Sequence, residues 1–287
     1  MQQVAIVGAA GKMGYWFTNY FAQRGLGVSA YDVNQKKILK TSRKVKVQKS
    51  LSQCVQDADL VVVCVPVQRT PQVIKECTKN MKDGAIIAEI SSVKNKTFAA
   101  LKKIPVNLRP LCIHPMFGPG ASKKVQTRLL LVPVRNEEME LKIANEIFEN
   151  ANVKVLPDAR QHDKSIAIVL GLTYFANMVF AKVISSANNI SMLKQVSGTT
   201  FGLQSLIAES ILTEEPDLVI ALISENIYVK RYINQYLKEV AELARLAVQK
   251  DNKDLKDELQ EVKSNMQKRQ DLQQSYNRMY EIIGKHR

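Results

Sequence analysis

Short apolar runs alternate with longer amphipathic segments through the first half of the chain. The run at residues 60–65 is continuous and largely β-branched, which is typical of a strand with both faces covered. Shorter runs of this kind predict further strands, and segments with helical periodicity between them predict helices. The expected strands are residues 4–7, 28–31, 60–65, 85–90, 111–113, 129–134 and 153–155, and the expected helices are 11–24, 70–81 and 137–150. This alternation predicts a mostly parallel sheet with helices on both faces.

The pattern changes near residue 160, after which almost no strand signal remains. Residues 165–186 are apolar on nearly all sides and predict a buried helix. Further helices are expected at residues 203–212, 217–250 and 253–283. We therefore expect an α/β domain at residues 1–160 and an all-α domain at residues 161–287. Helices this apolar are expected to pack against a second copy of themselves, as a homodimer.

Composition places the chain among ordinary soluble proteins. Its 287 residues are 46% hydrophobic and 24% charged, and no uninterrupted apolar run reaches the roughly 18 residues of a membrane span. The amino terminus leads directly into the first expected strand, so we expect no secretory signal. The four cysteines show no CxxC spacing, which favours a reduced, cytoplasmic protein without a structural metal; they are Cys54, Cys64, Cys77 and Cys112.

The net charge of +14 points to a negatively charged partner or substrate. Nucleic acid is one candidate, because lysine and arginine neutralise phosphates. A small anionic substrate together with a dinucleotide is another, since a positive field attracts both. No motif that mixes aromatic and basic residues accompanies the charge, so the small-molecule interpretation is favoured.

A glycine-rich segment, Gly8 to Gly14, lies between the first strand and the first helix. Glycine lets backbone N–H groups approach a pyrophosphate, and the helix N-terminus favours its negative charge. Ala9 stands where the usual GxGxxG pattern has its first glycine, and Gly8 precedes it. The position of the loop after a buried strand supports a dinucleotide-binding, doubly wound domain of the Rossmann type. The expected pyrophosphate contacts are Gly8, Ala10, Gly11, Lys12 and Met13.

Two further strand ends are candidates for dinucleotide contacts. Asp32 ends the second strand, 18 residues after Gly14, close to the position where an acid accepts the ribose hydroxyls. Such an acid favours NAD over NADP, although a basic run just beyond it (Lys36, Lys37, Arg43 and Lys44) could shift the preference towards NADP. The alternative is that Asp32 caps the next helix. Val65 and Pro66 end the central strand, where they either flank the nicotinamide-side ribose or simply terminate the strand.

A histidine at the end of an expected strand is the candidate catalytic residue. His114 is followed by Pro115-Met116-Phe117-Gly118-Pro119, and its neutral imidazole can accept a proton near pH 7. This segment resembles the HPM motif of prephenate and arogenate dehydrogenases. Ser91-Ser92-Val93-Lys94 resembles the family's SVK segment, and the end of the glycine-rich loop and the pair His162-Asp163 also fit. The resemblance runs over essentially the whole chain and is most specific up to residue 165.

The resemblance implies oxidative decarboxylation: prephenate would give 4-hydroxyphenylpyruvate, and arogenate would give tyrosine. It implies that His114 accepts the proton of the substrate hydroxyl and that Ser92 hydrogen-bonds this hydroxyl or the histidine. The alternatives are a histidine that packs the loop and a serine that caps a helix. Lys94 would meet an anion or remain solvated. For His162 and Asp163 we favour a role at the helix start and between domains over a catalytic pair, because adjacent residues on a helix do not face each other.

Two positions depart from the family pattern. Ser210 lies where the family usually has a carboxylate-binding arginine, counted back from Glu215-Pro216, and serine cannot replace a bidentate guanidinium. Tyr174 lies where the family often has a histidine, and its hydroxyl could still bind substrate. Other cations that could take the arginine's place are Lys182, Lys194, Lys230 and Arg231. Two other functions stay open: a non-catalytic dinucleotide-binding sensor and a β-hydroxyacid-type dehydrogenase.

Overall fold

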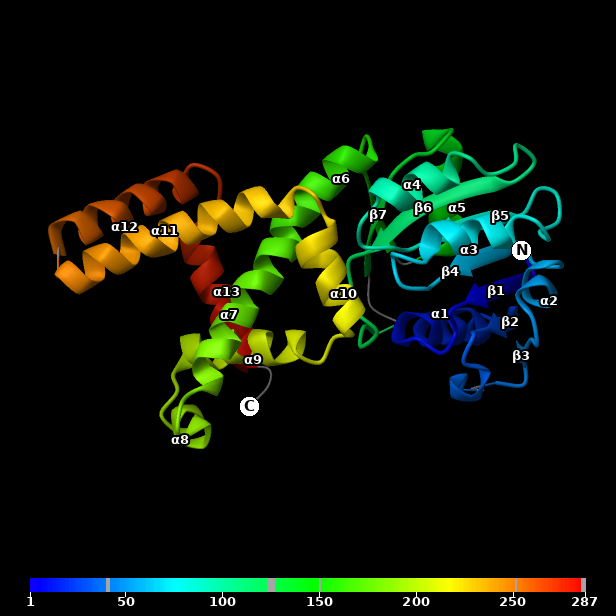
Figure 1. Ribbon diagram of the computed structural model, residues 1–287. Coiled ribbons are helices and arrows are strands. Elements are labelled where there is room, and N and C mark those ends of the chain that lie inside the picture. Colours follow the sequence, from blue (N-terminus) through cyan, green and yellow to red (C-terminus); the bar gives the residue numbers. More distant parts are fainter. Residues whose placement is uncertain (40–41, 123–126, 150, 251, 285–287) are drawn as a thin grey trace. The chain divides into compact units, whose positions relative to one another are not determined.

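A single eight-stranded sheet organises the first half of the protein. The computed structural model describes residues 1–39, 42–122, 127–149, 151–250 and 252–284 (Figure 1). Strand order is β3-β2-β1-β4-β5-β6-β7-β8, and β7 pairs with β6 in the antiparallel sense while the first six strands run parallel. The strands are β1 (Gln3–Val7), β2 (Gly27–Tyr31), β3 (Val45–Val47), β4 (Leu60–Val63), β5 (Ile86–Glu89), β6 (Arg109–Pro115), β7 (Thr127–Leu131) and β8 (Ala151–Val155).

Helices cover both faces of this sheet, because alternate residues of each central strand point to opposite sides. Val4 and Ile6 of β1 join one core with α1 and α5, whereas Ala5 and Val7 join the other core with α2, α3 and α4. The doubly wound α/β class predicted from the sequence is thereby confirmed. The helices of this unit are α1 (Lys12–Gln23), α2 (Leu51–Val55), α3 (Thr70–Cys77), α4 (Asn95–Leu101), α5 (Glu137–Ile147), α6 (Ala159–Ile166) and α10 (Pro216–Ile220), with a 3-10 turn η1 (Gln35–Lys37) and a π-helical turn η3 (Ala221–Glu225).

Aromatic rings tie α1 to the loop that follows β6. The Trp16 ring lies 4.8 Å from that of Phe117, centroid to centroid, and its indole N–H donates to the Ala121 carbonyl at 2.9 Å. Trp16 also stacks on Tyr20, at 5.2 Å. The helix that begins at the glycine-rich loop is therefore fastened to the segment just beyond His114.

A second compact unit comprises residues 168–215 and 227–287, while residues 1–167 and 216–226 form the first. Its elements are η2 (Ala167–Leu172, π-helical and continuous with the end of α6), α7 (Thr173–Ser185), α8 (Ile190–Gln195), α9 (Thr199–Ile211), α11 (Val229–Gln249), α12 (Asn252–Gln267) and α13 (Leu272–Gly284). This unit is wholly helical, and α7 packs against α9 within it.

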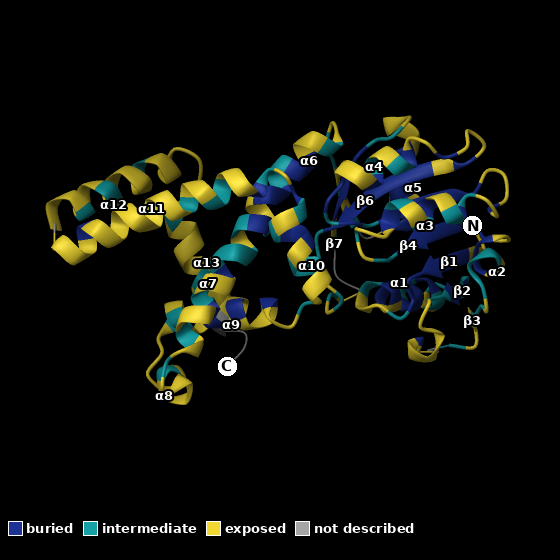
Figure 2. Ribbon diagram, in the orientation of Figure 1, coloured by how far each residue is buried: buried dark blue, intermediate teal, exposed yellow. Residues whose placement is uncertain are grey.

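The apolar helix predicted at residues 165–186 exists, but its expected burial is wrong for this chain alone. In α7 the buried residues are Asn177 and Ala181, while Val183 is 65% exposed (Figure 2). Helix Ala159–Ser185, which spans α6 to α7, is long and apolar enough by length and composition to cross a membrane, with a mean hydropathy of 1.8 in its most apolar window. One such helix is weak evidence for a membrane span, because a helix covered by other protein has the same composition.

Every strand predicted in the first half is confirmed, with ends that differ by up to three residues. Among the described residues, the short elements that the pattern missed include β3, α2, α4, α8 and the 3-10 turn η1. The helix expected at 217–250 is interrupted, because the backbone is extended at Asn226, and the one expected at 253–283 divides into α12 and α13.

Candidate active site

The glycine-rich loop connects β1 to α1 at the point where strand order reverses, which is where this fold binds ligands. Gly8 has a φ of +90°, and a Cβ placed on it would lie 2.4 Å from the Cys64 carbonyl oxygen. A Cβ on Gly14 would lie 2.0 Å from the Gly8 carbonyl oxygen, whereas one on Gly11 would meet nothing closer than 3.4 Å. Gly8 and Gly14 are thus the glycines that the backbone requires. Because Gly8 makes the tight turn, Ala9 is accommodated.

Asp32 follows β2 directly and reaches back to the loop. One carboxylate oxygen accepts the backbone N–H of Ala10 at 3.1 Å, and the other accepts that of Asn34 at 2.8 Å. These bonds hold a negative charge beside the glycine-rich loop, so the loop and the acid together fit a dinucleotide. At the end of β4, Val65 is half-buried and Pro66 is exposed, and the Pro66 carbonyl accepts the N–H groups that begin α3.

His114 lies near the carboxyl end of β6, at the same edge of the sheet as the loop after β1, since these strands run parallel. Its side chain is 3% exposed. Nδ1 of His114 lies 3.0 Å from Nε2 of His162 on α6, and Nδ1 of His162 lies 2.8 Å from Oδ1 of Asp163. These three side chains form a continuous hydrogen-bonded chain, which we call the relay.

Asp163 also anchors two other segments. Its Oδ1 accepts the backbone N–H of Lys94 at 2.8 Å and its Oδ2 that of Asn95 at 3.0 Å, so the carboxylate caps the N-terminus of α4. The amide of Asn226 donates to the Asp163 carbonyl at 2.8 Å. The reason given for disfavouring a pair, that adjacent helical residues do not face each other, does not hold for His162 and Asp163. Their Cβ atoms diverge, but a ring nitrogen and a carboxylate oxygen extend far enough to make contact.

The relay determines which histidine nitrogens carry protons. An ionised carboxylate only accepts, so Nδ1 of His162 is the donor and its Nε2 is an acceptor. Nδ1 of His114 must then donate, which leaves Nε2 of His114 with a lone pair. Within the described residues this atom has no hydrogen-bond partner, and the only fully buried side-chain polar atom there without a partner is Oγ of Ser205. Nε2 of His114 therefore keeps a lone pair that no described residue occupies.

Both imidazoles are held neutral by their surroundings. Burial, followed by the charges of His162 and Lys94, places the pKa of His114 well below its usual range. Burial and the charge of Lys94 lower the pKa of His162 in the same way. Burial raises the pKa of Asp163, and this effect opposes the N–H groups that its carboxylate accepts. A neutral His114 with a free Nε2 lone pair is equipped to take up a proton at pH 7.

Lys94 is neither solvated nor paired with an external anion. It is fully buried, and its ammonium donates to Oε1 of Glu89 at 2.6 Å and to the Ile113 carbonyl at 2.5 Å. The Cys112 thiol also donates a hydrogen bond to Oε1 of Glu89, with Sγ 3.0 Å from the oxygen, and Oε2 of Glu89 accepts the backbone N–H of Ser91 at 2.9 Å. Sequence analysis missed Glu89, although an acid at the end of an otherwise apolar strand was the available signal.

Ser92 is half-buried in the loop between β5 and α4, near the site in sequence. Within the described part of the chain its hydroxyl makes no hydrogen bond, and the partner of His114 is His162 instead. The neighbouring Ser91 hydroxyl bonds Thr70 at 3.1 Å. Contact between Ser92 and a substrate hydroxyl stays a prediction.

The candidate substrate residues of the helical domain belong to the second unit. Tyr174 is half-buried, and its pKa is raised by burial and by Glu214. Ser210 is exposed and donates its hydroxyl to the Ile207 carbonyl of its own helix, at 2.8 Å. Lys194 pairs with Glu209 at 2.7 Å, and Lys182, Lys230 and Arg231 are exposed.

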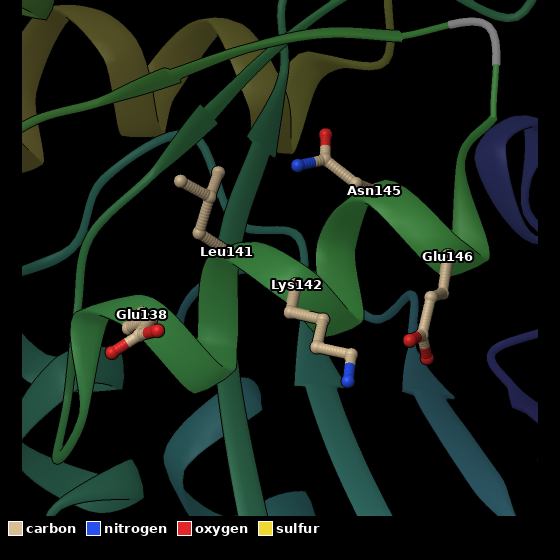
Figure 3. A pocket seen from close by; sticks show the side chains of 5 residues that line it. All are labelled: Glu138, Leu141, Lys142, Asn145 and Glu146. Carbon is tan, nitrogen blue, oxygen red and sulfur yellow. The ribbon is translucent and has the colours of Figure 1, made fainter.

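An open hollow of about 490 Å³ lies along one flank of α5. It is lined by Glu138, Leu141, Lys142, Asn145 and Glu146, all from that helix (Figure 3). None of these belongs to the relay or to the glycine-rich loop, so the hollow is separate from the site. Among the described residues no group of three or more histidine, cysteine or acidic side chains is arranged to hold a metal ion.

Fold and site together define the class of proteins in which a doubly wound α/β domain of the Rossmann type is joined to a helical unit. Residues 20–157 match the family model of the prephenate dehydrogenase nucleotide-binding domain, and residues 158–261 match that of the prephenate dehydrogenase dimerization domain. The chain belongs to the prephenate/arogenate dehydrogenase family, as the sequence motifs predicted.

Individual relatives agree with this assignment. The chain is 25% identical to a probable arogenate/prephenate dehydrogenase of Methanocaldococcus jannaschii, over 86% of this chain and 57% of the relative. It is 26% identical to the T-protein of Enterobacter agglomerans, over 84% and 62%. The chain thus spans about three fifths of the length of these curated relatives.

Solved structures share the fold. Prephenate dehydrogenase from Aquifex aeolicus, in complex with hydroxyphenyl propionate and NAD+, superposes with a TM-score of 0.73 at 22% identity, covering 93% of this chain and 98% of that one. Synechocystis arogenate dehydrogenase gives a TM-score of 0.66 at 15% identity, covering 93% and 99%.

Proposed function

We propose that this protein is an oxidoreductase that catalyses the NAD(P)-dependent oxidative decarboxylation of prephenate or arogenate in tyrosine biosynthesis. The observation that carries the proposal is the relay, which leaves the Nε2 lone pair of His114 without a partner among the described residues, at the ligand edge of the sheet. Membership of the family supplies the reaction class.

In this proposal His114 accepts the proton of the substrate hydroxyl at Nε2. A bound dinucleotide would supply a nicotinamide as the acceptor of the hydride from the carbon that bears this hydroxyl. The ring carboxylate then leaves as CO2, and the electrons of the broken C–C bond complete the aromatic ring. His162 and Asp163 hold the His114 ring in the correct tautomer, and the carboxylate offsets the charge that develops on it.

The cofactor would lie on the glycine-rich loop. Gly8, Ala10, Gly11, Lys12 and Met13 would contact the pyrophosphate with backbone N–H groups. Asp32 would accept the adenosine ribose hydroxyls, which favours NAD, and Val65 and Pro66 would flank the other ribose. A relative from Schizosaccharomyces pombe is named a probable NADP+-dependent prephenate dehydrogenase, so both cofactors belong in the assay.

The substrate is a small anion, with Ser92 and Tyr174 as its proposed polar contacts. Because Ser210 replaces the usual arginine, prephenate and arogenate both remain candidates. A relative from Streptomyces pristinaespiralis is named 4-amino-4-deoxyprephenate dehydrogenase, so a 4-amino analogue is a third.

The deciding experiment measures reduced-nicotinamide absorbance with each of these three substrates and each cofactor. We expect the wild-type protein to turn over at least one pair of substrate and cofactor. A His114→Asn variant should bind NAD normally but have a kcat lower by roughly 10²–10⁴-fold. A protein that binds NAD and reduces none of it would instead be a sensor. Turnover of β-hydroxyacids alone would indicate the other dehydrogenase class.

We further propose that the helical unit forms a homodimer and that the protein is cytoplasmic. Its large exposed apolar residues include Val183 on α7 and Leu206 on α9, both more than 60% exposed, and covering them needs a second surface. Val183→Asp should halve the mass measured by light scattering, whereas an unchanged mass would place the interface elsewhere. Recovery of the protein only in the detergent-soluble membrane fraction would contradict the cytoplasmic assignment.

A further inference from the structure

A complete ion pair lies buried behind the relay. The side chains of Lys94 and Glu89 are both 0% exposed, and their charged atoms are 2.6 Å apart. Removing two charges from water costs free energy that their attraction repays only in part, and apolar residues of similar size often stabilise a protein more. The presence of this pair next to a site therefore calls for a role other than holding the fold together.

Lys94 contacts one member of the relay and the residue next to another, through different parts of the residue. Its ammonium donates to the carbonyl of Ile113, the residue directly before His114 on β6. Its backbone N–H donates to Oδ1 of Asp163, the same oxygen that His162 contacts. The residue thus joins the strand that carries the proposed base to the carboxylate at the other end of the relay.

The charge of Lys94 acts on the same groups. Ionisable groups face it from β5, β6 and α6; they are Glu89, Cys112, His114, His162 and Asp163. The buried acid Glu140 on α5 acts on Cys112. Burial is the largest cause of the low pKa of His114 and of His162, and the positive charge of Lys94 lowers both further. A base must be unprotonated to act, so this charge extends activity towards lower pH.

We propose that Lys94 is a positioning residue of the relay, which ties the strand bearing His114 to the carboxylate of Asp163 and is itself held in place by Glu89. The inference rests on the proposed role of His114 as the base. It assigns to Lys94 no contact with substrate or cofactor. In this proposal the buried ion pair with Glu89 serves to keep the Lys94 ammonium beside the Ile113 carbonyl.

Three variants test the proposal. Lys94→Met keeps the length of the side chain without its charge or donors. It should lower kcat by up to about 10²-fold through misplacement of the base and move the acid limb of the kcat/KM profile to higher pH, without a change in NAD affinity. Glu89→Gln keeps the cation, so its acid limb should stay in place or move to lower pH. Lys82→Met removes the cation of an exposed ion pair with Asp59 and is the matched control, expected to behave as wild type.

Lys94→Met leaves the Glu89 carboxylate buried without its cation, so this variant could fail to fold. The double variant Glu89→Gln/Lys94→Met removes both charges and avoids that cost. It should give a normal circular dichroism spectrum and normal NAD binding, and still show the lower kcat and the shifted acid limb. If both variants fold and retain the kcat and acid limb of wild type, the proposal is wrong.

Imidazole NMR supplies a readout that needs no turnover. The chain has three histidines, so the signals of His114 and His162 can be assigned with His→Asn variants. In wild type both should be Nδ1–H tautomers, and Lys94→Met or the double variant should raise the pKa of His114 or mix its tautomers. Unchanged titration and tautomers would overturn the role of Lys94. If wild type turns over no substrate, the proposed function fails, but this titration still decides the role of Lys94.

Discussion

Asp163 offers a way to separate the charge of the relay from its geometry. Its Oδ1 accepts from both His162 and the Lys94 backbone, whereas its Oδ2 accepts only from the Asn95 backbone. An asparagine with its oxygen at the Oδ1 position keeps two of these three bonds and loses the charge. An alanine loses the bonds as well, so Asp163→Asn and Asp163→Ala should differ.

The magnitude follows from the distances. The two hydrogen bonds of 2.8 and 3.0 Å and the imidazole between them put the carboxylate about 8 Å from the base, where a unit charge is worth about 2 kcal/mol at an effective dielectric constant of about 20. Asp163→Asn should therefore lower kcat/KM by about 30-fold. Asp163→Ala also frees the His162 tautomer, and we expect a loss of about 10³-fold or more. In Asp163→Asn, the lost bond at the start of α4 should lower the free energy of unfolding by about 1 kcal/mol.

The assay is steady-state kinetics on variants checked for NAD binding and for unfolding in urea. Asp158→Asn is the matched control, because Asp158 caps α6, the helix that contains Asp163, through the Gln161 N–H and lies outside the relay. Its kinetics should equal those of wild type. Equal losses in Asp163→Asn and Asp163→Ala, or losses below twofold in both, would refute the separation of charge from geometry.

The remaining predictions concern stability and cofactor binding. Because folding holds the pKa of His114 and His162 below the value of about 6.5 in the unfolded chain, only the unfolded state binds these protons as the pH falls. The free energy of unfolding in urea should thus decrease below pH 6.5 and not above it, and a His114→Asn/His162→Asn variant should lose most of that slope. Gly14→Ala places a Cβ 2.0 Å from a loop carbonyl and should abolish NAD binding by calorimetry, whereas Gly202→Ala, with open space around it, should not. Asp32→Ala should weaken NAD binding and relax discrimination against NADP; an unchanged preference would reduce Asp32 to a turn former.

Local sequence was sufficient for the parts of the site that a few neighbouring residues determine. The turn at Gly8 and the position of His114 at a strand end follow from residues within one βα unit. Short elements such as β3 and α4 were missed, because each holds too few residues to show a period and depends on contacts elsewhere. For α4, those contacts come from the Asp163 carboxylate, 68 residues further along the chain than Asn95.

The long-range contacts could not be derived from spacing. Nothing in the sequence indicates that Lys94 turns inward to Glu89, since a lysine at a helix start is usually solvated. Nor did the rule for adjacent helical residues anticipate that His162 and Asp163 join in one line with His114. The apolar character of α7 was predicted correctly, but burial was assigned to the single chain, whereas much of that surface is exposed in it.

Trp16 gives the protein a built-in optical reporter. It is the only tryptophan in the sequence, and its indole bonds the backbone of the loop just past His114 while it sits on the helix that begins at the glycine-rich turn. Tryptophan fluorescence of the unlabelled protein therefore comes from one known location. Any ligand that shifts that loop against α1 will change the emission, so occupancy can be followed without dye, isotope or turnover.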